Sequence, residues 1–207
     1  HLLRHLIKKC TSTGVDGFII GDLGLLLLLK GKTKKEVHIS CMGTTFNSAT
    51  AKFYQQLGAT RIILPRELTS SEIKDFCKDI QNMELEVFVL NSLCENIDGF
   101  CRTYHGESQI VPNKKKKITH RHNYDPNYEG PFCSLDFKYK KITTSTTNFK
   151  SSPLLKNYNS YSNGPPCGAC ELYDFKLLGV HSLKIVERYL PLERKIICVK
   201  FVKECLT

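Results

Sequence analysis

The sequence contains no apolar run long enough to cross a membrane. The run Leu25–Leu29 has only five leucines, whereas a transmembrane helix needs about 20 apolar residues. A secretory leader is also lacking, because the amphipathic segment His1–Lys9 has no apolar core and no cleavage site. We therefore expect a cytoplasmic protein with no membrane partner.

The sequence signatures of the common proteases are missing as well. The chain has no Gly-x-Ser-x-Gly turn and no His-Glu-x-x-His helix, and no Cys–His pair stands out. These absences do not exclude a peptidase, but they leave such an activity without a recognisable mechanism.

Acidic residues are few compared with basic ones. The 207 residues include 30 Lys and Arg against 20 Asp and Glu, which gives a formal charge of +10. This charge favours an anionic partner such as nucleic acid, or it simply keeps the protein in solution. The hydrophobic fraction of 41% and the charged fraction of 24% are typical of a globular chain that forms one domain.

Helices and strands alternate along the chain. Three helical stripes each end at a glycine, Gly14, Gly58 or Gly179, and an apolar strand starts a few residues later. Two further apolar runs read as buried strands. We expect five strands, at Gly17–Ile20, at Glu36–Ser40, within Gly58–Leu64, at Leu85–Leu90 and within Gly179–Val186.

The clearest helix is Thr69–Ile80, which begins with a capping box formed by Thr69 and Glu72. Strands that recur with helices between them indicate parallel β/α units. We therefore expect an α/β fold of about five such units, which is too few to close an eight-stranded barrel.

The segment 102–166 breaks this rhythm. It contains the basic run Lys114–Lys117 together with His120 and His122, and it has little helical periodicity. An inserted subdomain or a lid over a site would fit, and the basic run is either a solvated loop or a phosphate contact. We expect one domain, with β/α units at 1–101, the insertion or lid at 102–166, and the last unit with a C-terminal helix at 167–207.

Polar side chains lie at or near the ends of the expected strands, where α/β proteins usually place their chemistry. Arg66 could hold a carboxylate or phosphate by a two-pronged contact, and Glu67 could move protons. A pair of Arg66 and Glu67 that only closes a loop is an equally good interpretation. The candidate catalytic residues are Asp22, Arg66, Glu67, Asn91 and Lys184.

Ten cysteines in a chain without a secretory leader indicate metal or redox chemistry more than disulfides. Cys94 and Cys101 follow the fourth strand and are too far apart to chelate alone, while Cys133, Cys167 and Cys170 lie in loops rich in Gly and Pro. An iron–sulfur cluster, a tetrahedral zinc site and ordinary reduced thiols are the three interpretations. We interpret the remaining cysteines as core or surface thiols: Cys10, Cys41, Cys77, Cys198 and Cys205.

Several segments together resemble the collagenase-like peptidase family U32. They are Leu64–Ile73 (LPRELTSSEI), Glu84–Val89 with Cys94 and Cys101 beyond it, Ser182–Arg188, and Asp16–Gly24. The resemblance implies a TIM-barrel-like catalytic domain. In the family such a domain usually begins with further β/α units, which this chain does not show. We therefore expect a partial barrel that needs a missing N-terminal segment or a protein partner beside its first strand.

Some members of this family are called peptidases or collagenases, and others are iron–sulfur enzymes. The latter hydroxylate tRNA uridines or ubiquinone precursors without oxygen, with prephenate as a hydroxyl source in known cases, and four cysteines hold their 4Fe–4S cluster. The matching positions here are Cys94, Cys101, Cys133 and Cys167, with Cys170 as the neighbouring alternative to Cys167.

The resemblance and the positive charge together imply an oxygen-independent modifying enzyme that acts on tRNA. The alternatives are a peptidase of unassigned mechanism and a non-catalytic partner subunit that only holds a cluster. Zinc is the alternative metal.

Overall fold

The computed structural model describes residues 2–90, 94, 97–101, 168–186 and 191–207. The chain divides into two compact units, His1–Phe100 with Pro165–Thr207, and Cys101–Gly164. All the helices and strands in the described part of the chain belong to the first unit. The role of 102–166 as an insertion or lid stays a prediction.

Five parallel strands form one sheet in the order β1-β2-β3-β4-β5. This confirms the predicted α/β fold, in which strands alternate with helices as in part of a TIM barrel. The strands are β1 (Gly17–Ile20), β2 (Glu36–Ile39), β3 (Arg61–Ile63), β4 (Glu84–Leu90) and β5 (Ser182–Ile185).

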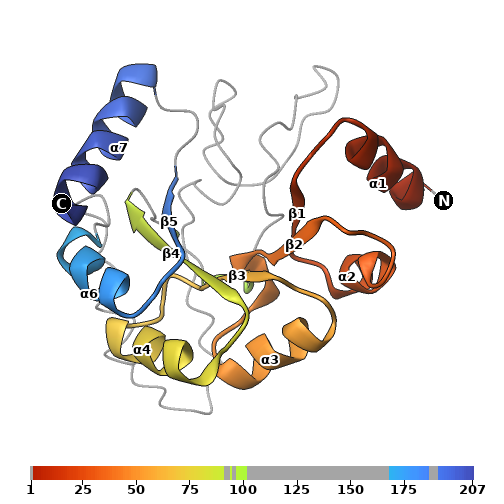
Figure 1. Ribbon diagram of the computed structural model, residues 1–207, viewed down its shortest axis with the longest axis horizontal. Coiled ribbons are helices and arrows are strands. Elements are labelled where there is room, and N and C mark those ends of the chain that lie inside the picture. Colours follow the sequence, from red (N-terminus) through yellow and green to blue (C-terminus); the bar gives the residue numbers. More distant parts are fainter. Residues whose placement is uncertain (1, 91–93, 95–96, 102–167, 187–190) are drawn as a thin grey trace, which may run out of the picture. The chain divides into compact units, whose positions relative to one another are not determined.

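Helices α2, α3, α4 and α6 lie along one side of the sheet (Figure 1). The run Leu25–Leu29, which is too short to span a membrane, forms most of α2. The helices are α1 (Leu2–Ser12), α2 (Leu23–Leu29), α3 (Ser48–Gln56), α4 (Ser70–Asp79), α6 (Leu172–Leu177) and α7 (Leu192–Leu206), with short 3₁₀ turns η1 (Cys41–Gly43) and η4 (Ala169–Glu171).

The helix boundaries follow the local signals in the sequence. Asn47 caps α3 by accepting a hydrogen bond from the Thr50 N–H at 2.9 Å, and the predicted capping box at the start of α4 is present. The three glycines expected after helices all have positive φ, which confirms the predicted stops.

The sheet buries only one of its faces against the helices. Because side chains alternate along a strand, every second residue of β2, β3 and β4 points toward the helices, and these residues are aliphatic. The core of the unit includes Val37, Ile39, Ile62, Leu85, Val87 and Val89 from the sheet, and Leu26, Leu29, Ala51, Ile73, Phe76, Leu172 and Phe175 from the helices.

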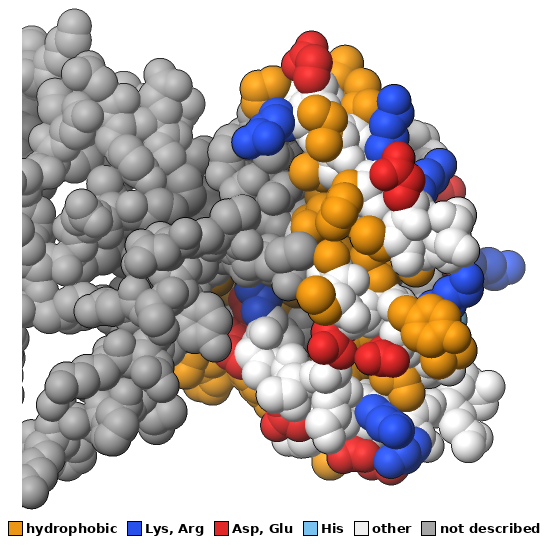
Figure 2. Space-filling model, turned by 90° about the vertical axis from the view of Figure 1, so that its left-hand side faces the viewer, with side chains coloured by type: hydrophobic (Ala, Val, Ile, Leu, Met, Phe, Trp, Pro, Cys, Tyr) orange, Lys and Arg blue, Asp and Glu red, His pale blue; other side chains and the backbone are white. Residues whose placement is uncertain are grey.

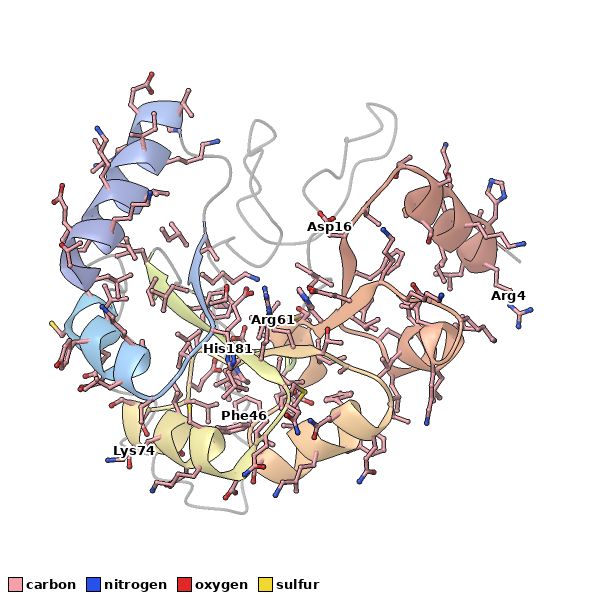
Figure 3. All side chains as sticks on the ribbon, viewed as in Figure 1. Arg4, Asp16, Phe46, Arg61, Lys74 and His181 are labelled. Atoms are coloured by element: carbon pink, nitrogen blue, oxygen red, sulfur yellow. The ribbon has the colours of Figure 1, made fainter. Side chains whose placement is uncertain are left out.

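The opposite face of the sheet carries charge. Registered pairs place His38 beside Arg61 and Arg61 beside Glu84. In Figure 3, Arg61 lies among the strands, whereas Lys74 on α4 points away from the sheet. We call this surface the charged face; its residues are Glu36, His38, Arg61, Glu84, Glu86 and Lys184.

Helices α6 and α7 leave apolar side chains exposed. Figure 2 shows hydrophobic side chains gathered on the face that carries these two helices. They include Tyr173, Leu177, Leu192, Ile197 and Phe201, and Val202 is the one fully buried residue that α7 contributes. Among the described helices, none is both long and apolar enough to cross a membrane.

The one-sided core generates a stability prediction for the central strand. Ile62 is 0% exposed and packs against the helices, whereas Ile19 in β1 is 61% exposed. We expect Ile62→Ala to lower the free energy of unfolding by about 2–5 kcal/mol, because it leaves a cavity in a packed core.

The matched control is Ile19→Ala, which removes the same atoms from an exposed position and should change stability by less than about 0.5 kcal/mol. Chemical denaturation curves of the two variants provide the measurement. Equal losses would show that the helices do not seal the core over β3.

Candidate functional site

Asp98 follows β4 in the chain and contacts the residues that follow β3. Its side chain is 3% exposed. One carboxylate oxygen accepts a hydrogen bond from the backbone N–H of Arg66 at 2.9 Å, and the other forms an ion pair with the Arg66 guanidinium. The backbone N–H of Asp98 donates to Glu67 Oε1 at 3.1 Å. We call Arg66, Glu67 and Asp98 the Asp98 clamp.

The clamp corrects one sequence interpretation. The polar contacts of Arg66 and Glu67 go to the same aspartate, which lies 32 positions after Arg66 and 31 after Glu67. Sequence reasoning missed Asp98. The dipeptide Asp98-Gly99 is a turn signal that could have drawn attention to it.

The Arg66 side chain is enclosed by the ends of neighbouring strands. Its guanidinium carbon lies 3.8 Å from the centroid of the Phe88 ring, and Nη1 lies 3.9 Å from Cys41 Sγ. Burial, followed by the Asp98 carboxylate, raises the pKa of the Cys41 thiol to about 11. Cys41 is therefore a protonated, buried thiol at neutral pH, as its interpretation as a core residue requires.

Burial also raises the pKa of the Glu67 carboxyl group. A raised carboxyl pKa brings the group closer to the range in which it can exchange protons at neutral pH. The same group already accepts the Asp98 N–H, however, so its observed contact is one that orients the chain.

Lys184 belongs to the charged face of the sheet. Its ammonium group lies 2.9 Å from Glu86 Oε1 and 5.5 Å from the centroid of the Phe88 ring. Arg61 reaches Glu86 from the other side at 3.4 Å and donates to Glu84 from Nε at 2.7 Å. This hydrogen bond lowers the pKa of the Glu84 carboxyl group. Lys184 therefore neutralises the buried carboxylate of Glu86.

The remaining candidate catalytic residues are separate from this cluster. Asp22 follows β1 and caps α2, with its Oδ1 accepting the Leu25 N–H at 2.7 Å. Asn91 lies outside the described residues. The structure thus brings Arg66 and Glu67 together at Asp98, and it brings Arg66 and Lys184 to the same aromatic ring.

Three of the candidate cysteine ligands are among the described residues. Cys94 and Cys101 are half-buried and flank the turn that contains Asp98, and Cys170 is exposed in η4. Cys133 and Cys167 lie outside the described residues. Within the described ranges, no group of three or more His, Cys, Asp or Glu side chains could hold a metal ion.

One hydrogen bond joins Gly168, just before η4, to the fourth strand. The N–H of Gly168 donates to the carbonyl oxygen of Val89 at 2.7 Å. A Cβ on Gly168 would lie 3.4 Å from Val89 Cα, so the backbones are in close approach. The start of η4, which contains Cys170, is therefore held beside the end of β4.

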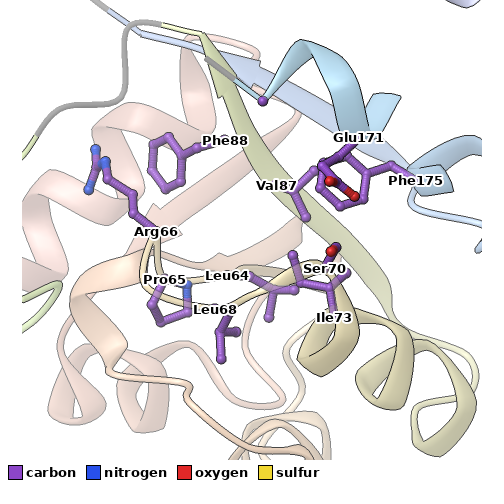
Figure 4. A pocket seen from close by; sticks show the side chains of 11 residues that line it. Leu64, Pro65, Arg66, Leu68, Ser70, Ile73, Val87, Phe88, Glu171 and Phe175 are labelled. Atoms are coloured by element: carbon purple, nitrogen blue, oxygen red, sulfur yellow. The ribbon is translucent and has the colours of Figure 1, made fainter. Parts of the chain in front are cut away.

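A pocket of ≈ 220 Å³ lies beside Arg66, between the end of β3, α4 and η4. Figure 4 shows Arg66 and Phe88 at one end of it, and Glu171 and Phe175 at the other. Its lining combines apolar side chains with the polar residues Arg66, Ser70 and Glu171. Such a lining suits a small group that has both apolar and polar parts.

The chain belongs to peptidase family U32, whose pattern it matches over residues 1–207. This confirms the resemblance found in the sequence. Among solved structures, the U32 peptidase Mk0906 aligns with 42% of this chain and 36% of that chain, with 23% identity and a TM-score of 0.40. That similarity is too low to support an argument.

Curated relatives match about half of the chain. The tRNA hydroxylation protein P of Escherichia coli is 38% identical over 96 residues, 46% of this chain and 21% of that protein. An uncharacterized protease of Methanocaldococcus jannaschii is 39% identical over 103 residues, 48% of this chain and 25% of that protein. A 23S rRNA 5-hydroxycytidine synthase of Escherichia coli is 30% identical over 111 residues, 54% of this chain and 16% of that protein. The chain thus spans a quarter or less of these relatives.

The charged face allows a test of Lys184. Glu86 is 7% exposed and has Lys184 and Arg61 as its cations. We expect Lys184→Met to lower the free energy of unfolding by about 1–3 kcal/mol, since it strips a buried carboxylate of one partner. In a double-mutant cycle with Glu86→Gln, the two changes should be coupled by about 0.5–3 kcal/mol.

Lys78→Met is the control, because it breaks an ion pair with Asp75 whose side chains are 63% and 69% exposed; it should cost at most about 1 kcal/mol. Thermal or urea unfolding measures the four proteins of the cycle and the control. Independent effects of Lys184→Met and Glu86→Gln would contradict the pairing and return Lys184 to the purely catalytic interpretation.

Proposed function

We propose that this chain is part of an iron–sulfur-dependent enzyme that hydroxylates tRNA without oxygen. Two of the curated relatives described above are a tRNA hydroxylation protein and an rRNA hydroxycytidine synthase. The formal charge of +10 suits a polyanionic substrate. A cytoplasmic location is part of the proposal.

The observation that carries the proposal is the anchoring of cysteine segments at one strand end. Cys94 and Cys101 flank a turn that is anchored through the buried Asp98, and Gly168, two residues before Cys170, is hydrogen-bonded to β4. Thiols from separate loops at one strand end are suitable donors for a cluster.

The proposed ligands are Cys94, Cys101, Cys133 and Cys167, with Cys170 as the alternative fourth. When bound, a 4Fe–4S cluster supplies one-electron chemistry at a potential tuned by nearby hydrogen bonds and burial. Arg66 and Lys184 both approach the Phe88 ring, which lines the pocket together with Arg66. We propose that this end of the sheet accepts the small co-substrate, and that basic loops contact the RNA.

A zinc site, a peptidase and a non-catalytic partner subunit that only holds a cluster are the alternatives. The peptidase is favoured by the family's description and by the relative from Methanocaldococcus jannaschii, which is called a protease. Metal content separates zinc from iron, and gelatin or peptide cleavage without tRNA modification would establish the peptidase. A cluster without either activity, even when the chain is joined to its family's upstream units, would establish the partner subunit.

The cluster itself is directly testable. Protein purified without oxygen should be brown and contain about four irons and four sulfides per chain. Cys94→Ser and Cys101→Ser should each remove the visible absorbance and most of the iron, because each deletes a ligand.

Cys10→Ser and Cys205→Ser are the matched controls, since both thiols are exposed on terminal helices; they should leave iron and colour unchanged. Colourless protein with stoichiometric zinc would overturn the cluster.

The RNA partner can be tested through the salt dependence of binding. We expect tRNA affinity to fall steeply as salt rises, and changing Lys114–Lys117 to glutamine should flatten the slope of log affinity against log salt, because fewer counterions are released. Filter binding or fluorescence anisotropy at several salt concentrations gives this slope.

A second lysine cluster provides the control. Lys30, Lys32, Lys34 and Lys35 precede β2 and therefore lie at the amino end of the sheet, away from the carboxyl edge. Replacing these four by glutamine removes the same charge and should change the slope less. Identical slopes for both quadruple variants would mean that binding follows net charge alone.

A further inference from the structure

The turn Ile97–Phe100 is held on one side by the loop that follows β2. Gly99 has a φ of +83°, and a Cβ there would collide with the Thr44 side chain and come within 3.1 Å of the Met42 carbonyl oxygen. The rings of Phe100 and Phe46 have centroids 6.3 Å apart. Only glycine fits between the turn and this loop.

The loop that follows β3 holds the same turn from another side. Arg66 uses both its backbone N–H and its guanidinium on the Asp98 carboxylate, and Glu67 accepts the Asp98 N–H. Hydrogen bonds to a charged group are among the stronger ones in proteins, and a carboxylate that is 3% exposed depends on them. Three contacts therefore converge on one residue of a short turn.

The two cysteines lie immediately around this turn. Cys101 directly follows Phe100, and Cys94 lies three residues before Ile97. Anything that fixes the four-residue turn therefore limits the positions of both thiols. Arg66 and Glu67 stand at a strand end, where catalytic residues gather, yet their observed polar partner is this turn.

We propose that the Asp98 clamp positions Cys94 and Cys101, and that Arg66 and Glu67 are positioning residues that act through Asp98. The inference rests on the proposed function only for what the two thiols hold. The clamp sets their spacing in the metal-free protein as well, so it can be tested without any cofactor.

The test measures thiol alkylation in metal-free protein, cysteine by cysteine, by mass spectrometry. In Asp98→Ala we expect Cys94 and Cys101 to react at least about tenfold faster than in the wild type, because a charge-assisted network no longer opposes local opening. Cys77, which is half-buried on α4, should keep its rate. Asp75→Ala, which removes an aspartate from an exposed ion pair with Lys78 on α4, is the matched control and should leave the rates of Cys94 and Cys101 unchanged.

A milder pair of variants separates local from global opening. Glu67→Leu removes the acceptor for the Asp98 N–H and should also accelerate Cys94 and Cys101, whereas Glu67→Gln keeps an acceptor oxygen and should restore the wild-type rates. Unchanged rates in Asp98→Ala, or an acceleration in Glu67→Leu that Cys77 shares, would overturn the clamp.

A second readout uses the loaded protein. If the cluster is present, Glu67→Leu should lose iron to a chelator several times faster than Glu67→Gln, while Asp75→Ala matches the wild type. Wild-type protein without iron would contradict the proposed function. The alkylation rates would then still test the positioning of the two cysteines, so the two failures are distinguishable.

Discussion

Glu86 imposes the constraint on which the sheet depends. A carboxylate that is 7% exposed is costly to bury unless cations reach it. The cations come from both neighbouring strands, Arg61 from β3 and Lys184 from β5. The strand register that satisfies Glu86 is also the register that turns the aliphatic residues of β4 toward the helices, so charge pairing and core burial select the same alignment.

The carboxyl edge repeats this arrangement with Asp98. Here too a buried acid is satisfied by an arginine, but the acid belongs to a loop and not to a strand. The consequence differs accordingly. Glu86 fixes which strands are neighbours, whereas Asp98 fixes how a short turn sits above them. A chain whose candidate ligands lie in loops needs a contact such as that of Asp98, because the sheet itself positions only the residues at its edge.

The strands and the best helices could be predicted because their signals are local. Apolar alternation, caps and helix-ending glycines act within a few residues. The helix predicted at Thr69–Ile80 is α4, with Thr69 and Ile80 as its caps. The partners of charged side chains are set by tertiary packing. Nothing near Arg66 in the sequence indicates a partner 32 positions later, so the sequence suggests only a ligand contact or a pair with Glu67. Asp22 was assigned by strand position, although it also satisfies the rule for a helix cap.

The cysteines show the same division. Their number and their position after a strand pointed to a site, and the family membership is established over the whole chain. Sequence spacing could not reveal that Gly168 attaches to Val89, since this contact depends on close approach of two backbones. Nor could it show that Cys41 lies beside Arg66 with its thiol kept protonated by burial.

The order of the strands has a consequence for how the chain reaches this structure. Strands β1 to β4 each pair with the strand that comes next in sequence, and Arg61 meets Glu84 after only 23 positions. Lys184 meets Glu86 after 98 positions, and closing the longer loop costs about 1 kcal/mol more in chain entropy. This difference favours pairing of the first four strands before β5 docks. A β4 without β5 has a bare edge and a Glu86 that lacks one of its cations, which makes the strand that leads to Cys94 a site for mispairing.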